Sequence, residues 1–276
     1  ILIGPEGGFN NNEIKYLTKV IKTADPLTNG KELKIFEKRL RKYLKVNNIF
    51  ATSSAASSLE IISLLLHLKK NDEIIIPAHT YCASAISFAR NGAKIIWADI
   101  DAETRVISED DILKKINKKT KAIVVVHLYG FVFDIEKLKK KINKKIFIIE
   151  DCAQAFGAQI KNKKAGTLGD FSCFSFHAQK NLTTLGEGGA IYVKEKKLAK
   201  KVPGLRHNGH APYSNMAFEA EFSSDFLYEI VCSDNNYLLG DLNFDGIINI
   251  LDVIVVVNIV LGIQGANDTE LVVSDV

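Results

Sequence analysis

The sequence predicts an α/β fold in which a mostly parallel β-sheet is covered by helices on both faces. Two observations favour this class. Between about residues 24 and 215, short apolar stretches alternate with stretches of helical period, and the apolar stretches are continuous, as in strands buried on both faces. The chain has 276 residues, 47% hydrophobic and 25% charged, which suffices for one core with small appendages.

The elements are expected in a regular order along the chain. After a turn at residues 28–30, an amphipathic helix is predicted over 32–44. Strands are predicted over 49–52, 73–76, 94–98, 122–126, 146–149 and 171–176. Helices are predicted between them over 57–68, 83–91, 109–116 and 135–142.

The charge pattern argues against two classes of partner. The net charge of +4 comes from lysine pairs with almost no aromatic residues between them, so we interpret them as solvated helix faces and expect no nucleic acid. No stretch reaches transmembrane length, because the longest apolar run, residues 247–263, is interrupted by polar residues. The four cysteines show no C-x-x-C spacing, and three of them lie inside apolar runs, where small buried thiols are expected. This favours a reducing compartment, and we expect a cytoplasmic protein.

Asp151 and Lys180 are the first candidate site residues. Asp151 follows an apolar stretch at the carboxyl end of a predicted parallel strand, where it could pair with a protonated pyridine nitrogen or simply cap a turn. Lys180 lies between the 171–176 strand and the turn 186–189, where burial favours an uncharged, nucleophilic amine. Ser175, on the same strand, can offer a hydroxyl to a phosphate. Taken alone, Lys180 would be interpreted as one more surface lysine of a lysine-rich chain, and only its combination with other motifs changes that.

Two further segments point to the same kind of ligand. Residues 52–57, T-S-S-A-A-S, join a strand to a helix, and the small Ala55 and Ala56 let backbone N–H groups approach a phosphate. Residues 77–81, P-A-H-T-Y, end the next strand and place Tyr81 where its ring could stack on a flat cofactor.

In this order, the motifs resemble those of the DegT/StrS-type sugar aminotransferases, pyridoxal-phosphate (PLP) enzymes of fold type I. After the small-residue turn come P-A-H-T-Y, G-A-K-I-I-W-A-D-I-D, V-H-L-Y-G, E-D-C-A-Q-A-F-G-A, S-F-H-A-Q-K-N-L-T-T-L-G-E-G-G and L-R-H-N-G-H. Seven signatures in the family's order and spacing, over about 190 residues, make the resemblance specific.

The resemblance implies roles for the candidate residues. Lys180 would carry the cofactor as a Schiff base, Asp151 would pair with its ring nitrogen, and Gln154 would lie near its phenolic oxygen. Tyr81 would stack on the ring. The phosphate would be held by Ser175 and the Ala55–Ala56 backbone.

The resemblance also implies the substrates and the assembly. The enzyme would move an amino group from a donor such as glutamate to a nucleotide-linked keto-sugar, as a homodimer. His127 and His177 belong to the family pattern and are expected to be structural supports. Ala56 and Gln179 stand where the family usually has threonine. The family continues for more than a hundred residues with a small domain that has no counterpart in this chain, so we expect residues 23–216 to be an inactive fragment.

The two ends of the chain resemble other families. Residues 1–22, with I-L-I-G-P-E-G-G-F, resemble the cofactor loop of knotted (SPOUT) rRNA uridine methyltransferases. Residues 217–239 are predicted to be a linker, residues 240–264 resemble one dockerin type I repeat with calcium-loop spacing, and 265–276 form a tail. The expected calcium ligands are Asp241, Asn243, Asp245, Ile247 (at the backbone-carbonyl position), Asn249 and Asp252.

These three parts belong to different cell compartments. We therefore expect a chimeric reading frame, joined near residue 22 and again between residues 215 and 240. Two alternatives to a working enzyme stay open: a non-catalytic calcium-binding adhesion module attached through the dockerin-like tail, and an aminotransferase-like domain that binds cofactor without activity.

Overall fold

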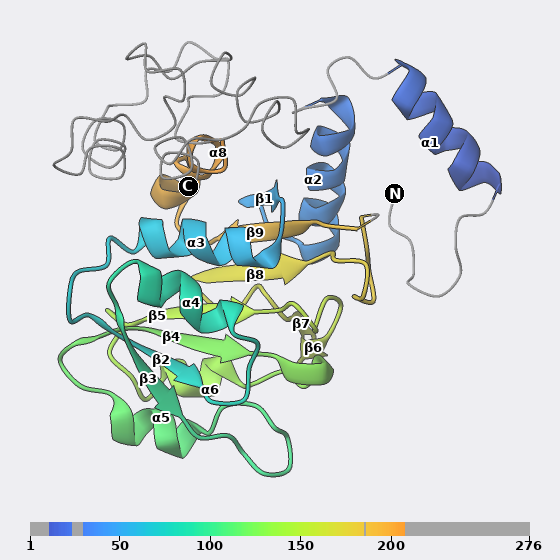
Figure 1. The fold of residues 1–276 in the computed structure, drawn as a ribbon. Helices are drawn as coiled ribbons and strands as arrows, with labels where there is room; N and C mark the ends of the chain where they lie inside the picture. Colours follow the sequence, from blue (N-terminus) through green and yellow to red (C-terminus); the bar gives the residue numbers. More distant parts are fainter. Residues whose placement is uncertain (1–10, 24–29, 185, 208–276) are drawn as a thin grey trace, which may run out of the picture. The chain divides into compact units, whose positions relative to one another are not determined.

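The structure, a computed structural model, describes residues 11–23, 30–184 and 186–207 (Figure 1). They belong to the first of two compact units, residues 1–208 and 209–276. The predicted linker, the six calcium ligands and the tail lie outside the described residues, as does the I-L-I-G-P-E-G-G-F segment at residues 1–9. Among the helices that are described, none is both long enough and apolar enough to cross a membrane.

The centre of the fold is a seven-stranded sheet in the order β1-β9-β8-β5-β4-β2-β3. Its strands are β1 (Ile49–Thr52), β2 (Glu73–Pro77), β3 (Lys94–Ala98), β4 (Thr120–Val126), β5 (Phe147–Asp151), β8 (Phe171–Ser175) and β9 (Gly189–Val193). The five strands from β8 to β3 are parallel, which confirms the predicted mostly parallel sheet. β9 runs antiparallel to both β8 and β1, and β6 (Gln159–Ile160) with β7 (Lys163–Lys164) forms a separate hairpin.

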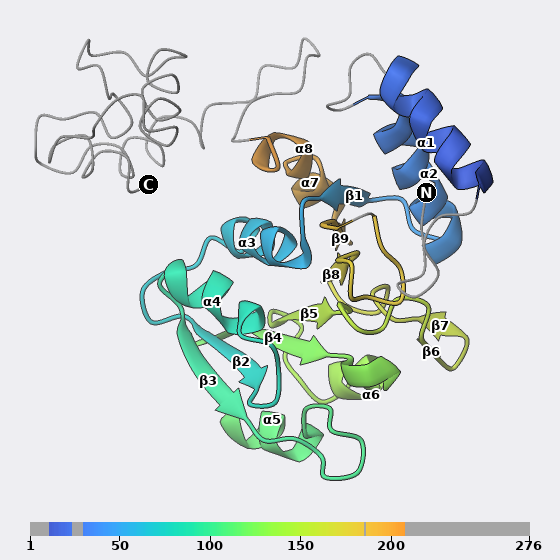
Figure 2. The same cartoon turned by 45° about the vertical axis from the view of Figure 1, so that its right-hand side comes forward.

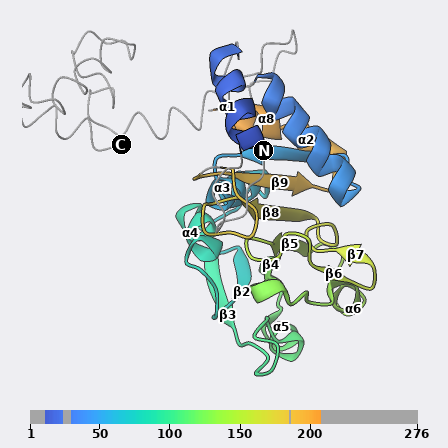
Figure 3. The same cartoon turned by 90° about the vertical axis from the view of Figure 1, so that its right-hand side faces the viewer.

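Helices cover both faces of the sheet, as predicted. Figures 1 and 3 show α3 (Ala55–Leu65) and α4 (Ala83–Arg90) on one face and α5 (Glu109–Lys115) and α6 (Ile135–Lys139) on the other. α2 (Lys31–Leu44) packs against β1, and α3 lies along β8 and β9 (Figure 2). The remaining helices are α1 (Asn11–Thr23), the 3-10 turn η1 (Leu128–Gly130), α7 (Lys196–Ala199) and α8 (Val202–Leu205).

Burial explains why the strands are continuously apolar. Ile74, Ile75 and Ile76 of β2 are all 0% exposed, because successive side chains point to opposite faces and both faces are covered. They pack in one cluster with Leu59 of α3 and Phe88 of α4. Most predicted boundaries hold within about two residues. The exceptions are both in helices: the helix predicted over 57–68 already ends at residue 65, and the one predicted over 135–142 ends at residue 139.

Candidate active site

A cavity of about 460 Å³ lies where the strand order reverses. β2 and β4 are neighbours in the sheet. The strand that follows β2 in the chain, β3, lies on one side of this pair, and the strand that follows β4, β5, lies on the other side. Such a reversal opens a crevice at the carboxyl ends of the two strands. Thr80 and Tyr81, which follow β2, line this cavity together with Val126 and Leu128 at the end of β4.

The residues predicted for the cofactor site all line this cavity. They are Ala55, Ala56, Tyr81, Asp151, Gln154, Ser175 and Lys180. They come from segments far apart in the sequence, and the fold brings them together around one cavity. The individual roles of these residues toward a cofactor stay predictions.

One end of the cavity has the features of a phosphate site. Gly189 is paired with Ser175 of β8 and with Thr52 of β1, so three strands are aligned there. A Cβ on Gly189 would lie 2.3 Å from the backbone carbon of Ser54 and 2.7 Å from the nitrogen of Ala55. Glycine therefore permits the N-terminus of α3 to lie against the sheet, beside the buried hydroxyl of Ser175. Backbone N–H groups at a helix N-terminus favour an anion.

Asp151 ends β5, and its side chain is almost completely buried. Its Oδ2 accepts a hydrogen bond from the Ser84 hydroxyl at 2.7 Å, and its Oδ1 accepts one from the Ala153 N–H at 3.0 Å. Sequence reasoning missed Ser84. The available signal was a serine on the face of a predicted helix that otherwise packs apolar residues on the sheet.

Lys180 lies in the loop that joins β8 to β9, and its side chain is half-buried. The loop is closed by a hydrogen bond from the Phe176 N–H to the Gly188 carbonyl at 2.7 Å. The Lys180 N–H donates to the His177 carbonyl at 2.9 Å, and the His177 ring lies 3.4 Å from the Glu187 carboxylate. His177 also lines the cavity, so its expected role as a structural support stays a prediction.

Gln154 and Tyr81 lie at the more open part of the cavity. Gln154 is exposed, and its Oε1 accepts a hydrogen bond from the Tyr129 N–H at 3.2 Å. Tyr81 is 76% exposed, so its ring has a free face that a ligand could cover. Stacking on a cofactor would bury part of this apolar surface.

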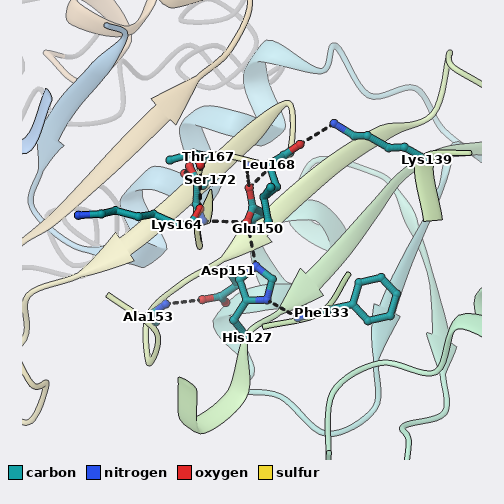
Figure 4. Close-up of polar contacts among 12 residues, drawn as sticks. His127, Phe133, Lys139, Glu150, Asp151, Ala153, Lys164, Thr167, Leu168 and Ser172 are labelled. Carbon is teal, nitrogen blue, oxygen red and sulfur yellow. Dashed lines mark hydrogen bonds and ion pairs between the residues drawn. The ribbon is translucent and has the colours of Figure 1, made fainter. Parts of the chain in front are cut away.

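Behind the cavity, Glu150 has a hydrogen-bond network of its own, drawn in Figure 4. Its Oε1 accepts from the N–H groups of Leu168 and Gly169, and its Oε2 accepts from the Gly166 N–H and from the His127 ring. The His127 Nδ1 accepts from the Phe133 N–H at 3.2 Å, so Nε2 is the nitrogen that donates to Glu150. His127 is fully buried and supports the fold, as expected.

His127, Glu150 and Cys152 lie close enough for one metal ion, with their ligand atoms within 4.8 Å of one another. The hydrogen bonds argue against that use, because the Glu150 oxygens already accept four donors and both His127 nitrogens are engaged. Burial also raises the pKa of the Cys152 thiol well above its ordinary value, which disfavours the thiolate that metals prefer.

Known proteins resemble this chain in both sequence and structure. GDP-perosamine synthase from Vibrio cholerae is 36% identical over 205 residues, which cover 74% of this chain and 56% of that enzyme. dTDP-3-amino-3,6-dideoxy-alpha-D-galactopyranose transaminase from Aneurinibacillus thermoaerophilus is 39% identical, over 78% of this chain and 60% of that enzyme. The chain thus spans a little over half the length of these curated relatives.

Among solved structures, the PLP form of Spr1654 from Streptococcus pneumoniae matches with a TM-score of 0.66 and 30% identity, over 72% of this chain and 55% of that one. The GDP-4-keto-6-deoxy-D-mannose-3-dehydratase from E. coli matches with a TM-score of 0.68 and 25% identity, over 74% of this chain and 54% of that one.

The profile of the DegT/DnrJ/EryC1/StrS aminotransferase family matches residues 9–232. The match includes helix α1, which lies almost entirely in the segment expected to be methyltransferase-like, and most of the predicted linker. None of the similarities described here supports a SPOUT-like N-terminus or a dockerin repeat. With its motifs in the family's order, its parallel sheet and a profile match over most of its length, the chain belongs to the DegT/DnrJ/EryC1/StrS aminotransferase family.

Proposed function

We propose that this chain is the cofactor-binding part of a PLP-dependent aminotransferase that acts on a nucleotide-linked keto-sugar, with an amino acid such as glutamate as donor. One observation carries the proposal: a lysine, a carboxylate, a buried serine and a helix N-terminus converge on one cavity of about 460 Å³. The names of the relatives support the substrate class, since two of them make or aminate sugars linked to GDP or dTDP.

The residues present fit PLP. Its phosphate suits the N-terminus of α3 and the Ser175 hydroxyl, where Gly189 leaves space that a Cβ would fill. Its protonated ring nitrogen suits the Asp151 carboxylate, and its flat ring suits Tyr81. When bound, PLP supplies an electron sink for the carbon that loses a proton.

In this proposal the protein's own groups hold, orient and move protons. The Asp151 carboxylate would keep a proton on the ring nitrogen. Lys180 Nζ would hold the cofactor, then take the proton from Cα of the amino donor and deliver it to C4′ of the cofactor. Gln154, whose Oε1 accepts a hydrogen bond from the Tyr129 N–H, would lie near the phenolic oxygen of the cofactor.

The absorbance spectrum of the purified chain with added PLP tests the proposal. A visible band should appear, and it should vanish in Lys180→Ala. Lys197→Ala removes an exposed lysine of α7 and is the matched control, which should keep the band. A band that persists in Lys180→Ala would show that the lysine is wrongly assigned.

A second assay tests the reaction. Glutamate and a panel of nucleotide keto-sugars are supplied, and aminated sugar is distinguished from dehydrated sugar by mass spectrometry, because a 3-dehydratase has a similar fold. Aminated product is the expected result, and dehydrated product alone would contradict the proposal. Sedimentation of the same sample checks whether this chain forms the homodimer that the family resemblance implies.

A further inference from the structure

Two hydroxyl groups lie in series behind the Asp151 carboxylate. Ser84 is 0% exposed, and its Oγ donates to Asp151 Oδ2 at 2.7 Å. Thr80 Oγ1 lies 2.8 Å from Ser84 Oγ. A serine hydroxyl has a single proton, and here it is used on Asp151, so the Thr80 hydroxyl is the donor to Ser84. The direction of this chain, from Thr80 through Ser84 to Asp151, is therefore fixed.

The same segment also carries the aromatic residue of the site. The Ser84 N–H donates to the Tyr81 carbonyl at 3.1 Å, and Thr80 and Tyr81 both line the cavity. The second carboxylate oxygen is fixed by the Ala153 N–H. The first turn of α4 thus ties the orientation of the carboxylate to the position of Tyr81.

We infer that Ser84 and Thr80 are positioning residues that hold the Asp151 carboxylate in place for a cationic ring nitrogen. The inference rests on the proposed function, because PLP supplies that nitrogen. Without the Ser84 hydroxyl, Oδ2 loses its buried donor, and the carboxylate is free to rotate or to recruit water. A carboxylate that is already oriented before PLP binds does not have to be ordered by the ligand, so less binding free energy is lost.

PLP affinity, measured by titrating the visible band of the full chain, is the test. Ser84→Ala should weaken binding by about 10- to 100-fold, the effect of one hydrogen bond to a charged group. Thr80→Val keeps the shape of Thr80 and should weaken binding by about 3- to 10-fold, since it acts one bond further away. Ser84→Thr restores a hydroxyl and should bind within about 3-fold of the parent.

Ser87→Ala is the matched control. Ser87 is also a buried serine of α4, but its hydroxyl donates only within the helix, to the Ala83 carbonyl at 3.4 Å. It should bind PLP as the parent does. Equal affinities of Ser84→Ala and Ser87→Ala would overturn the inference.

A double-mutant cycle separates positioning from a purely structural effect. In an Asp151→Asn background, Ser84→Ala should cost little further affinity, because the group that it orients is gone. An equal loss in both backgrounds would mean that Ser84 acts on the fold alone, and the inference would fail. A parent chain that gives no band with PLP would defeat the proposed function as well, so the two failures are distinguishable.

Discussion

Glu150 and Asp151 are neighbours on β5, yet their carboxylates are used in opposite ways. Glu150 is 0% exposed and accepts four hydrogen bonds, all from the protein. Asp151, on the other face, lines the cavity and accepts two from the protein. A carboxylate offers about four acceptor sites, so Glu150 is saturated while Asp151 keeps capacity for a ligand. Counting donors thus distinguishes a structural carboxylate from one available for chemistry.

The turn that surrounds Glu150 shows why the two faces differ. Gly166, at φ +85°, and Gly169 let the backbone turn its N–H groups inward onto the carboxylate. A Cβ on Gly169 would lie 2.8 Å from the Ile148 carbonyl, so this close approach requires glycine. Asp151 faces a cavity instead, and its donors come from one side chain and one backbone N–H.

The largest effect is expected from Glu150→Ala. It leaves three backbone N–H groups and the His127 ring without an acceptor inside the protein. We expect the free energy of unfolding to fall by about 3–5 kcal/mol, as when one partner of a buried pair is removed. Urea unfolding measures it. Glu60→Ala, which breaks a more exposed pair with Arg90 (N–O distance 3.6 Å), should cost no more than about 1 kcal/mol. If Glu150→Ala and Glu60→Ala lowered the free energy of unfolding by similar amounts, the hydrogen bonds of Glu150 would not be specially important for stability.

Asp151→Asn should give the converse result. An amide cannot hold the proton of a ring nitrogen as a carboxylate does, so the rate of the amino-donor half-reaction should fall by at least about 100-fold, or about 2.7 kcal/mol. The free energy of unfolding should change by no more than about 1 kcal/mol. Stopped-flow absorbance and urea unfolding of the same sample provide the two numbers. If Asp151→Asn lost much stability but kept normal half-reaction rates, Asp151 would be the structural carboxylate and the prediction would be wrong.

Two glycine substitutions sharpen the comparison. Gly189→Ala places a methyl against the Ser54 backbone on the cavity side, whereas Gly166→Ala places one 2.1 Å from the Phe174 ring on the Glu150 side. Each should cost about 1–3 kcal/mol of stability through overpacking. The weakening of PLP binding, about 10-fold, should occur in Gly189→Ala alone. PLP titrations of both variants, at a temperature where each is folded, measure whether binding is weakened in Gly189→Ala alone.

The smallest effect is expected in thiol labelling. Burial raises the pKa of the Cys152 and Cys173 thiols well above the ordinary value, whereas Cys82 is exposed. The thiolate is the reactive form, so iodoacetamide at neutral pH should label Cys82 and spare the two buried thiols. Peptide mass spectrometry reads the sites. Rapid labelling of Cys152 in the folded parent would show that the Glu150 side is open to solvent.

Much of this arrangement was accessible from the sequence for a simple reason. A strand that is buried on both faces appears in the sequence as a continuous apolar run. The candidate residues lie at or just after the ends of such runs. Asp151, Ser175 and Lys180 could therefore be placed near one another before their geometry was known. The mostly parallel sheet could be predicted in the same way.

Other features depend on contacts that no local pattern records. The Ser84 hydroxyl is a candidate site group only because it contacts Asp151, which lies 67 positions away in the sequence. The saturation of Glu150 requires a turn 16 to 19 residues further along the chain to fold back on it. The antiparallel β9 also escaped prediction, because an apolar run shows burial without showing direction.

The pairing of Thr52 with Gly189 has a consequence for how the protein is made. These residues lie more than 130 positions apart, and closing a longer loop costs about 0.6 kcal/mol of entropy for each doubling of its length. On the ribosome, the parallel strands from β2 to β5 can pair while β9 is still unsynthesised. The end of the cavity beside Gly189, in contrast, forms only after β9 pairs with β1. A ligand bound there would stabilise only the completed sheet, so its binding would act late in maturation and hold together the two ends of the nascent domain.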